Sequence, residues 1–211
     1  MRSWHRTVKG SCNLMSVPNT TTEALADVNY AFRHLEFAIR LMCYCESGHL
    51  DLPNLDTDVS ILLERENVGF PSGTFSTIEA VVPAAQALVG MAFGTSAMVL
   101  DAAFEVAGFK NNPHSRQPED ELRTLVYMVR CAFAHNPARP LWEARGEKYA
   151  QMISLPVGGM ALPIDLASLH GQSFEYDHIG GFASWLRIRA ASETLIRDAQ
   201  PVIPADALRR R

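Results

Sequence analysis

One arginine and one histidine, Arg130 and His135, lie five residues apart in a stretch suited to chemistry on a phosphate group. An imidazole titrates near neutral pH, so it can act as a general acid or a general base. A guanidinium presents a planar fork of donors that pairs with two phosphate oxygens and stabilises negative charge developing on them. Whether the two side chains can act together depends on the element that carries them.

That element is predicted to be a helix that begins at Pro118, where proline and three acidic residues favour a first turn. Apolar side chains then recur at helical spacing and form one core-facing stripe, made of Leu122, Leu125, Val126, Val129 and Phe133. Asn136 followed by Pro137 predicts the helix end, because Asn tolerates the left-handed cap position and Pro cannot continue the ladder. Arg130 and His135 fall outside the stripe and point about 140° apart around an ideal helix.

A second packing face is predicted on the same helix. Tyr127, Cys131 and Ala134 lie between the arginine and the histidine, where a solvated face would carry Lys and Glu. Small side chains there suit close contact with another helix. A two-fold axis would use the same patch twice, so we expect a homodimer built on this face.

The stretch from Val129 to Asn136, with Pro140 and Trp142 downstream, resembles the signature of the HEPN superfamily: an Arg, four residues and a His near a helix end. The layout around Asp165–Leu166, Gly171 and Gly180–Gly181 is also similar to small bacterial HEPN-like proteins. The resemblance covers residues 20–199 in layout and about a dozen residues in motif. It implies a four-helix bundle and a ribonuclease that needs no metal and acts as a dimer.

The resemblance implies catalytic roles for Arg130 and His135, with Asn136, Cys131 and Tyr127 as supporting or substrate-binding residues. The 2′-hydroxyl of single-stranded RNA would attack the neighbouring phosphorus and leave a 2′,3′-cyclic phosphate. One His per chain does not easily serve as both base and acid, so a shared dimer cleft is expected. A toxin–antitoxin or bacterial defence setting, with an antitoxin-like protein partner, belongs to the same expectation.

A second function class stays open. Active HEPN proteins often carry Asn, Asp or His after the motif Arg, whereas this chain carries Cys131. A non-catalytic HEPN-like module that binds a nucleotide, RNA or a partner protein would fit that difference. A purely structural role also stays open, in which His135 stabilises the negative helix end and Arg130 pairs with Glu36 or Glu143.

Composition limits the partners and the compartment. The 211 residues carry a net charge of −4, so bulk electrostatics do not favour nucleic acid, and an RNA site requires a local basic patch. The four cysteines have no zinc spacing, and His114, His170 and His178 stand in separate loops. We therefore expect free thiols, no metal, no cofactor and a cytoplasmic location. Residues 1–16 lack the apolar core of a signal peptide.

The expected fold is mostly α: a four-helix HEPN-like bundle with two short β-hairpins. Helices are predicted from Thr20–Thr22 to Glu46, from Ser76–Glu79 to beyond Leu100, from Pro118 to His135, and over residues 182–199, with hairpins near 59–70 and 149–167. The uncharged stretch Ala80–Leu100 is long enough to span a bilayer, but its many small and polar residues favour a buried core helix. The expected division is a loosely ordered lead-in (1–19), one helical domain (20–199) and a basic tail (200–211).

Overall fold

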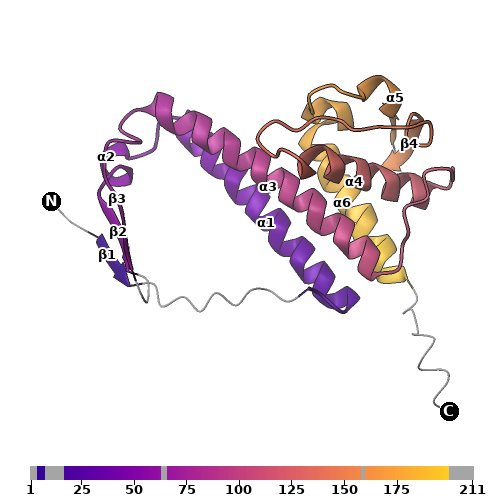
Figure 1. The fold of residues 1–211 in the computed structure, drawn as a ribbon, viewed down its shortest axis with the longest axis horizontal. Helices are drawn as coiled ribbons and strands as arrows, with labels where there is room; N and C mark the ends of the chain where they lie inside the picture. Colours follow the sequence, from indigo (N-terminus) through magenta and orange to yellow (C-terminus); the bar gives the residue numbers. More distant parts are fainter. Residues whose placement is uncertain (1–3, 8–16, 63–65, 158–159, 200–211) are drawn as a thin grey trace, which may run out of the picture. The chain divides into compact units, whose positions relative to one another are not determined.

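The computed structural model describes residues 4–7, 17–62, 66–157 and 160–199 (Figure 1). Its helices are α1 (Thr21–Glu46), α2 (Leu52–Leu55), α3 (Ile78–Val106), α4 (Pro118–Ala134), α5 (Leu166–Leu169) and α6 (Gly181–Asp198), with a 3₁₀ turn η1 (Tyr176–Ile179). Its strands are β1 (Trp4–Thr7), β2 (Val59–Leu62), β3 (Asn67–Phe70), β4 (Met152–Val157) and β5 (Met160–Asp165). The predicted mostly α fold with short β-hairpins is confirmed.

Both predicted hairpins form. Strands β2 and β3 pair antiparallel from Val59–Phe70 to Leu62–Asn67, and β4 and β5 pair antiparallel from Met152–Asp165 to Val157–Met160. The sequence did not predict β1, which pairs parallel with β2 from within the expected lead-in. Most of that lead-in, the 158–159 turn and the basic tail 200–211 lie outside the described residues.

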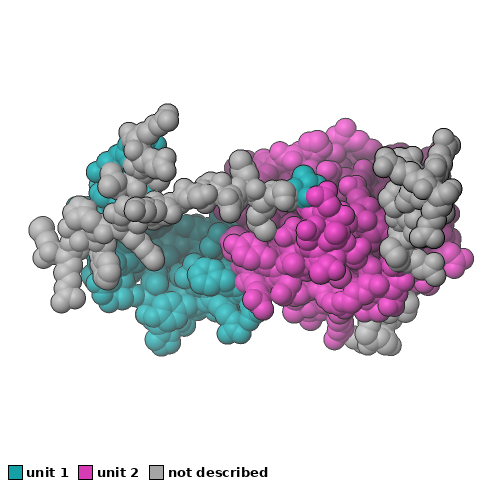
Figure 2. Space-filling view, turned by 90° about the horizontal axis from the view of Figure 1, so that it is seen from below, with its two compact units in different colours: residues 1–17, 35–89 teal, residues 18–34, 90–211 magenta. Residues whose placement is uncertain are grey.

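The chain divides into two compact units (Figure 2). Unit 1 comprises residues 1–17 and 35–89, and unit 2 comprises residues 18–34 and 90–211. The division falls inside the long helices α1 and α3, so each of these helices contributes one segment to each unit. Every residue of the candidate site lies in unit 2.

An aromatic cluster forms the centre of unit 2. Phe93 of α3 is fully buried, and five aromatic rings lie with their centroids 5.0 to 5.9 Å from its own: Phe133, Phe174, Tyr176, Phe182 and Trp185. Aromatic pairs at such separations stabilise a core beyond the area that they bury. Helix α4 faces this cluster with its apolar stripe, and all five predicted stripe residues are buried.

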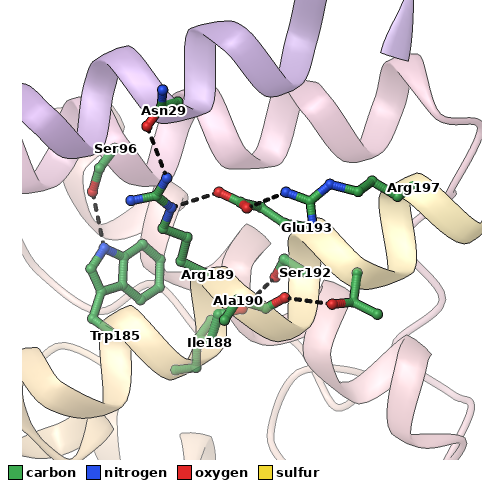
Figure 3. Close-up of polar contacts among 10 residues, drawn as sticks. Asn29, Ser96, Trp185, Ile188, Arg189, Ala190, Ser192, Glu193 and Arg197 are labelled. Atoms are coloured by element: carbon green, nitrogen blue, oxygen red, sulfur yellow. Dashed lines mark hydrogen bonds and ion pairs between the residues drawn. The ribbon is translucent and has the colours of Figure 1, made fainter. Parts of the chain in front are cut away.

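Polar contacts attach α6 to its neighbours within unit 2 (Figure 3). The indole Nε1 of Trp185 donates a hydrogen bond to the Ser96 hydroxyl of α3 at 3.0 Å, and both side chains are buried. Arg189 donates to the Asn29 side chain of α1 at 3.3 Å and stacks over Phe32. Glu193 accepts from Arg189 and Arg197, each at 2.6 Å, which fixes the exposed side of α6.

Helices α3 and α4 approach closely at Gly94. A Cβ atom at this position would lie 2.7 Å from the Phe133 ring, closer than real Cβ contacts.

Among the described helices, α3 alone has the length and composition to cross a membrane, and 56% of its most apolar 18-residue window is buried. One of the small residues of α3, Gly94, allows helix α4 to approach closely.

Unit 1 contains a smaller core and the short helix α2, which is not among the helices predicted from the sequence. Cys45, Val81 and Ala85 are buried together, with half-buried apolar side chains around them. In α2, the Asp51 side chain accepts a hydrogen bond from the Asn54 backbone, and a proline occupies the first turn. An aspartate cap followed by proline is a standard helix start, but four residues are too few to show a helical period.

Candidate functional site

Arg130 lies on α4 with its guanidinium beside a buried carboxylate of α3. Its Nε atom is 3.8 Å from Oδ2 of Asp101, whose side chain is only 7% exposed. The Arg130 side chain itself is 41% exposed. The arginine is thus anchored on its inner side and open to solvent on its outer side. The carboxylates suggested by the sequence for this arginine, Glu36 and Glu143, are not its partners; Asp101 is.

Asp101 also holds a second arginine. The Arg123 guanidinium, 2% exposed, forms an ion pair with Oδ1 of Asp101 and lies 3.8 Å from the exposed Glu105. Its Nε donates to the Phe109 carbonyl, and the group lies over the Phe104 ring. Two guanidinium groups therefore share one buried carboxylate. Because Glu105 is exposed, water weakens its pairing with Arg123, so Asp101 is the main carboxylate for both arginines.

His135 follows the last residue of α4 and is its C-cap. Its side chain is 75% exposed, and Nε2 lies 3.5 Å from Oε2 of Glu143. The other carboxylate oxygen of Glu143 lies 3.5 Å from the Arg145 guanidinium. Each of the two motif residues thus has a carboxylate partner on a different segment: Asp101 for the arginine and Glu143 for the histidine.

The segment that carries Glu143 is fixed to the rest of unit 2 by its backbone. Trp142 is fully buried; its backbone exchanges hydrogen bonds with Gln172 and Gly171, and its indole donates to His178 at 3.0 Å. One residue earlier, the Leu141 amide donates to the Ala132 carbonyl of α4. These contacts return the chain to the end of α4, which is why Glu143 lies near His135.

Asn136 shapes the turn after α4. Its side-chain oxygen accepts a hydrogen bond from the Ala138 amide at 3.1 Å, and its carbonyl accepts from Arg139. The predicted helix stop is correct, but its mechanism differs. No non-glycine residue in the described ranges has a positive φ, so Asn136 ends the helix through an Asx-type turn and not a left-handed cap.

Tyr127 and Cys131 lie side by side on α4, one turn apart. Hydrogen bonding with the Cys131 side chain raises the pKa of Tyr127, and the proximity of Tyr149 acts in the same direction. The Tyr127 ring stacks on Tyr149, with the centroids 5.8 Å apart. Part of the predicted second packing face is therefore covered by the same chain, while Ala134 remains exposed.

The local charge differs from that of the whole chain. Between Arg130 and Lys148 there are four basic residues against two acidic ones, although the chain has a net charge of −4. Arg130, Arg139 and Arg145 all occur in this stretch. An excess of basic side chains in one stretch is the sequence feature that RNA binding by an acidic protein requires.

Asp101 and Arg123 were not predicted as site residues, although the sequence pattern around each of them indicates a buried charge. Asp101 is the first charge after 21 uncharged residues, and a charge on such a helix requires a buried partner. Arg123 lies next to the apolar stripe of α4, where an arginine must also be paired when buried. No group of three or more His, Cys, Asp or Glu side chains that could hold a metal ion occurs in the described residues, so His114, His170 and His178 form no such group.

Comparisons of the chain with protein-family models, with curated proteins and with solved structures find no match. The geometry of Arg130, His135 and their two carboxylates is therefore the basis of the proposed function.

Proposed function

We propose that the chain is a metal-independent endoribonuclease of HEPN type, in which Arg130 and His135 act on one phosphodiester. The observation that carries the proposal is the pairing of two guanidinium groups with a single buried carboxylate, Asp101. The Arg130 side chain keeps an exposed outer side, and the exposed imidazole of His135 follows on the same helix five residues later. A phosphate is an anion that such a fork of donors binds through paired hydrogen bonds.

The proposed reaction is transfer of the phosphorus from the 5′-oxygen to the 2′-oxygen. A neutral His135 imidazole accepts the 2′-hydroxyl proton while the 2′-oxygen forms its bond to phosphorus. The bond to the 5′-oxygen then breaks, and a protonated imidazole donates a proton to that oxygen. Arg130 stabilises the charge on the phosphate oxygens throughout. A second copy of the chain supplies the second imidazole, and the products are a 2′,3′-cyclic phosphate and a 5′-hydroxyl.

The test is incubation of labelled single-stranded RNA with the purified protein in EDTA. We expect cleavage of RNA but not of DNA, since DNA lacks the 2′-hydroxyl, and products that carry a cyclic phosphate. Arg130→Ala and His135→Ala should each lower the rate by at least about 100-fold. Arg130→Lys tests whether the fork is required, because lysine keeps the charge and loses the paired donors.

Matched controls exist on the same unit. Arg197→Ala removes an exposed arginine from α6, and His170→Ala removes an exposed histidine after α5. Neither control should change the cleavage rate. Metal-dependent cleavage, or cleavage that survives loss of both Arg130 and His135, would contradict the proposed mechanism.

One observation favours the alternative, a non-catalytic module that binds a nucleotide, RNA or a partner protein. Cys131, at the position where active HEPN proteins often carry a polar side chain, interacts with Tyr127 of its own helix. If no RNA is cleaved, binding of RNA that is lost in Arg130→Ala would support the alternative. A gain of cleavage in Cys131→Asn would identify a degenerate nuclease.

A further inference from the structure

We propose that Glu143 is a positioning residue that holds the Nε2–H group of His135, so that Nδ1 is the nitrogen that exchanges a proton with RNA. This inference rests on the proposed function and deepens it. A neutral imidazole carries its proton on only one nitrogen, and the partner of that nitrogen selects the tautomer. Here the partner is a carboxylate, which can only accept.

The geometry identifies which nitrogen faces Glu143. Oε2 of Glu143 lies 3.5 Å from Nε2 of His135. This distance is longer than a normal hydrogen bond, but catalytic hydrogen bonds are often long before substrate binds and shorten in the complex. With Nε2 facing the carboxylate, Nδ1 is the nitrogen left to exchange a proton with a substrate.

Glu143 is the fixed member of the pair. Its side chain is 27% exposed, whereas that of His135 is 75% exposed. It directly follows the buried Trp142, and its second oxygen lies 3.5 Å from the Arg145 guanidinium. A carboxylate that is less exposed than the ring beside it, and that follows a buried tryptophan in the chain, can orient that ring.

The same carboxylate contributes to the reaction step. When Nδ1 accepts the 2′-hydroxyl proton, the ring becomes an imidazolium, and a negative charge on its far side stabilises that cation. Arg145 lies beside the other carboxylate oxygen of Glu143. Replacing Arg145 should therefore leave the contact between Glu143 and His135 in place. Glu147, an exposed carboxylate of the same loop, provides the matched control.

The first measurement is independent of activity. Nitrogen NMR of the histidine rings, at a pH above the usual imidazole range, reports the tautomer of each ring. The His135 signals are assigned by their loss in His135→Ala, and exposed His170 serves as the internal reference. We expect His135 to be more completely in the Nε2–H form than His170. Glu143→Ala should bring it to the His170 ratio, whereas Glu143→Gln, which retains an acceptor oxygen, and Glu147→Ala should not.

The second measurement is the rate of RNA cleavage. Glu143→Ala should lower kcat by about tenfold or more with little change in KM, because the Glu143 carboxylate orients the base and does not bind RNA. Glu143→Gln should restore part of the loss. A His135 tautomer that is the same in wild type and Glu143→Ala would overturn the inference, whether or not RNA is cleaved. A protein with the expected tautomers that cleaves no RNA would instead contradict the proposed function alone.

Discussion

At the scale of single residues, Asp101 is the group on which both arginines depend. It is buried in α3, and the ion pairs with Arg123 and Arg130 are what compensate its removal from water. Breaking a buried pair by removing one partner is much more costly than breaking an exposed pair, because a charge is left without compensation. The site therefore depends on a residue that does not touch the proposed substrate.

We predict that Asp101→Asn lowers the free energy of unfolding by about 3–5 kcal/mol, measured by urea denaturation. The control is Glu105→Gln, which removes the exposed carboxylate near the same Arg123. Since exposed pairs contribute little, its effect should stay below about 1 kcal/mol. Equal losses in the two variants would show that Asp101 is not the carboxylate that stabilises the buried arginine.

The sequence selected Arg130 and His135 as candidates but did not give their carboxylate partners. The two residues could be selected because they fall outside the apolar stripe and have the spacing of the HEPN signature near a helix end. Asp101 could not be assigned to Arg130, because nothing in the sequence gives the rotation of α3 relative to α4. Glu143 was considered as a partner of Arg130 and is a partner of His135. The error has a physical cause, since the turn at Asn136 redirects the chain after α4.

At the scale of elements, the contact between α3 and α4 places Asp101 beneath Arg130. Gly94 lies on α3 about two turns before Asp101, and it meets the side chain of Phe133 on α4. Phe133 is buried and belongs to the aromatic cluster around Phe93. The closeness of the two helices thus depends on the absence of a side chain at position 94.

We predict that Gly94→Ala destabilises the protein by about 1–3 kcal/mol, because the added methyl group overlaps the Phe133 ring. Gly90→Ala is the matched control, since a Cβ atom at position 90 meets nothing within 4 Å. That substitution should be neutral or stabilising by up to about 1 kcal/mol, because alanine favours a helix. Thermal unfolding of both variants distinguishes the two effects. A neutral Gly94→Ala would mean that the helices separate at no cost.

The long elements could be predicted from the sequence and the short ones could not. Helices α1, α3, α4 and α6 each have several turns of apolar spacing, and two hairpins have apolar runs on either side of a turn. Strand β1 and helix α2 have four residues each, too few for a period. The pairing of β1 with β2 also joins segments more than fifty residues apart, which a local pattern does not report.

At the scale of the whole molecule, the proposed reaction needs two imidazoles and each chain offers one at the site. A homodimer on the α4 face would supply the second. Tyr149 covers Tyr127, so the contact available to a second copy is narrower than the sequence suggested. The residue of the predicted dimer face that remains open to a second copy is Ala134, which is exposed one turn after Arg130.

We predict that the protein is a dimer at micromolar concentration and that Ala134→Arg makes it a monomer, measured by light scattering. A long charged side chain at a two-fold contact meets its own copy, so both the volume and the charge oppose association. Ala183→Arg places the same side chain on an exposed position of α6 and should leave the dimer intact. The thermal unfolding of both variants should match wild type apart from any contribution of the dimer. If cleavage of RNA is lost together with the dimer in Ala134→Arg, while Ala183→Arg keeps both, the active site is shared. A wild-type monomer that cleaves RNA would place both proton transfers within one chain, and His135 would then need a partner acid that the two-fold arrangement makes unnecessary.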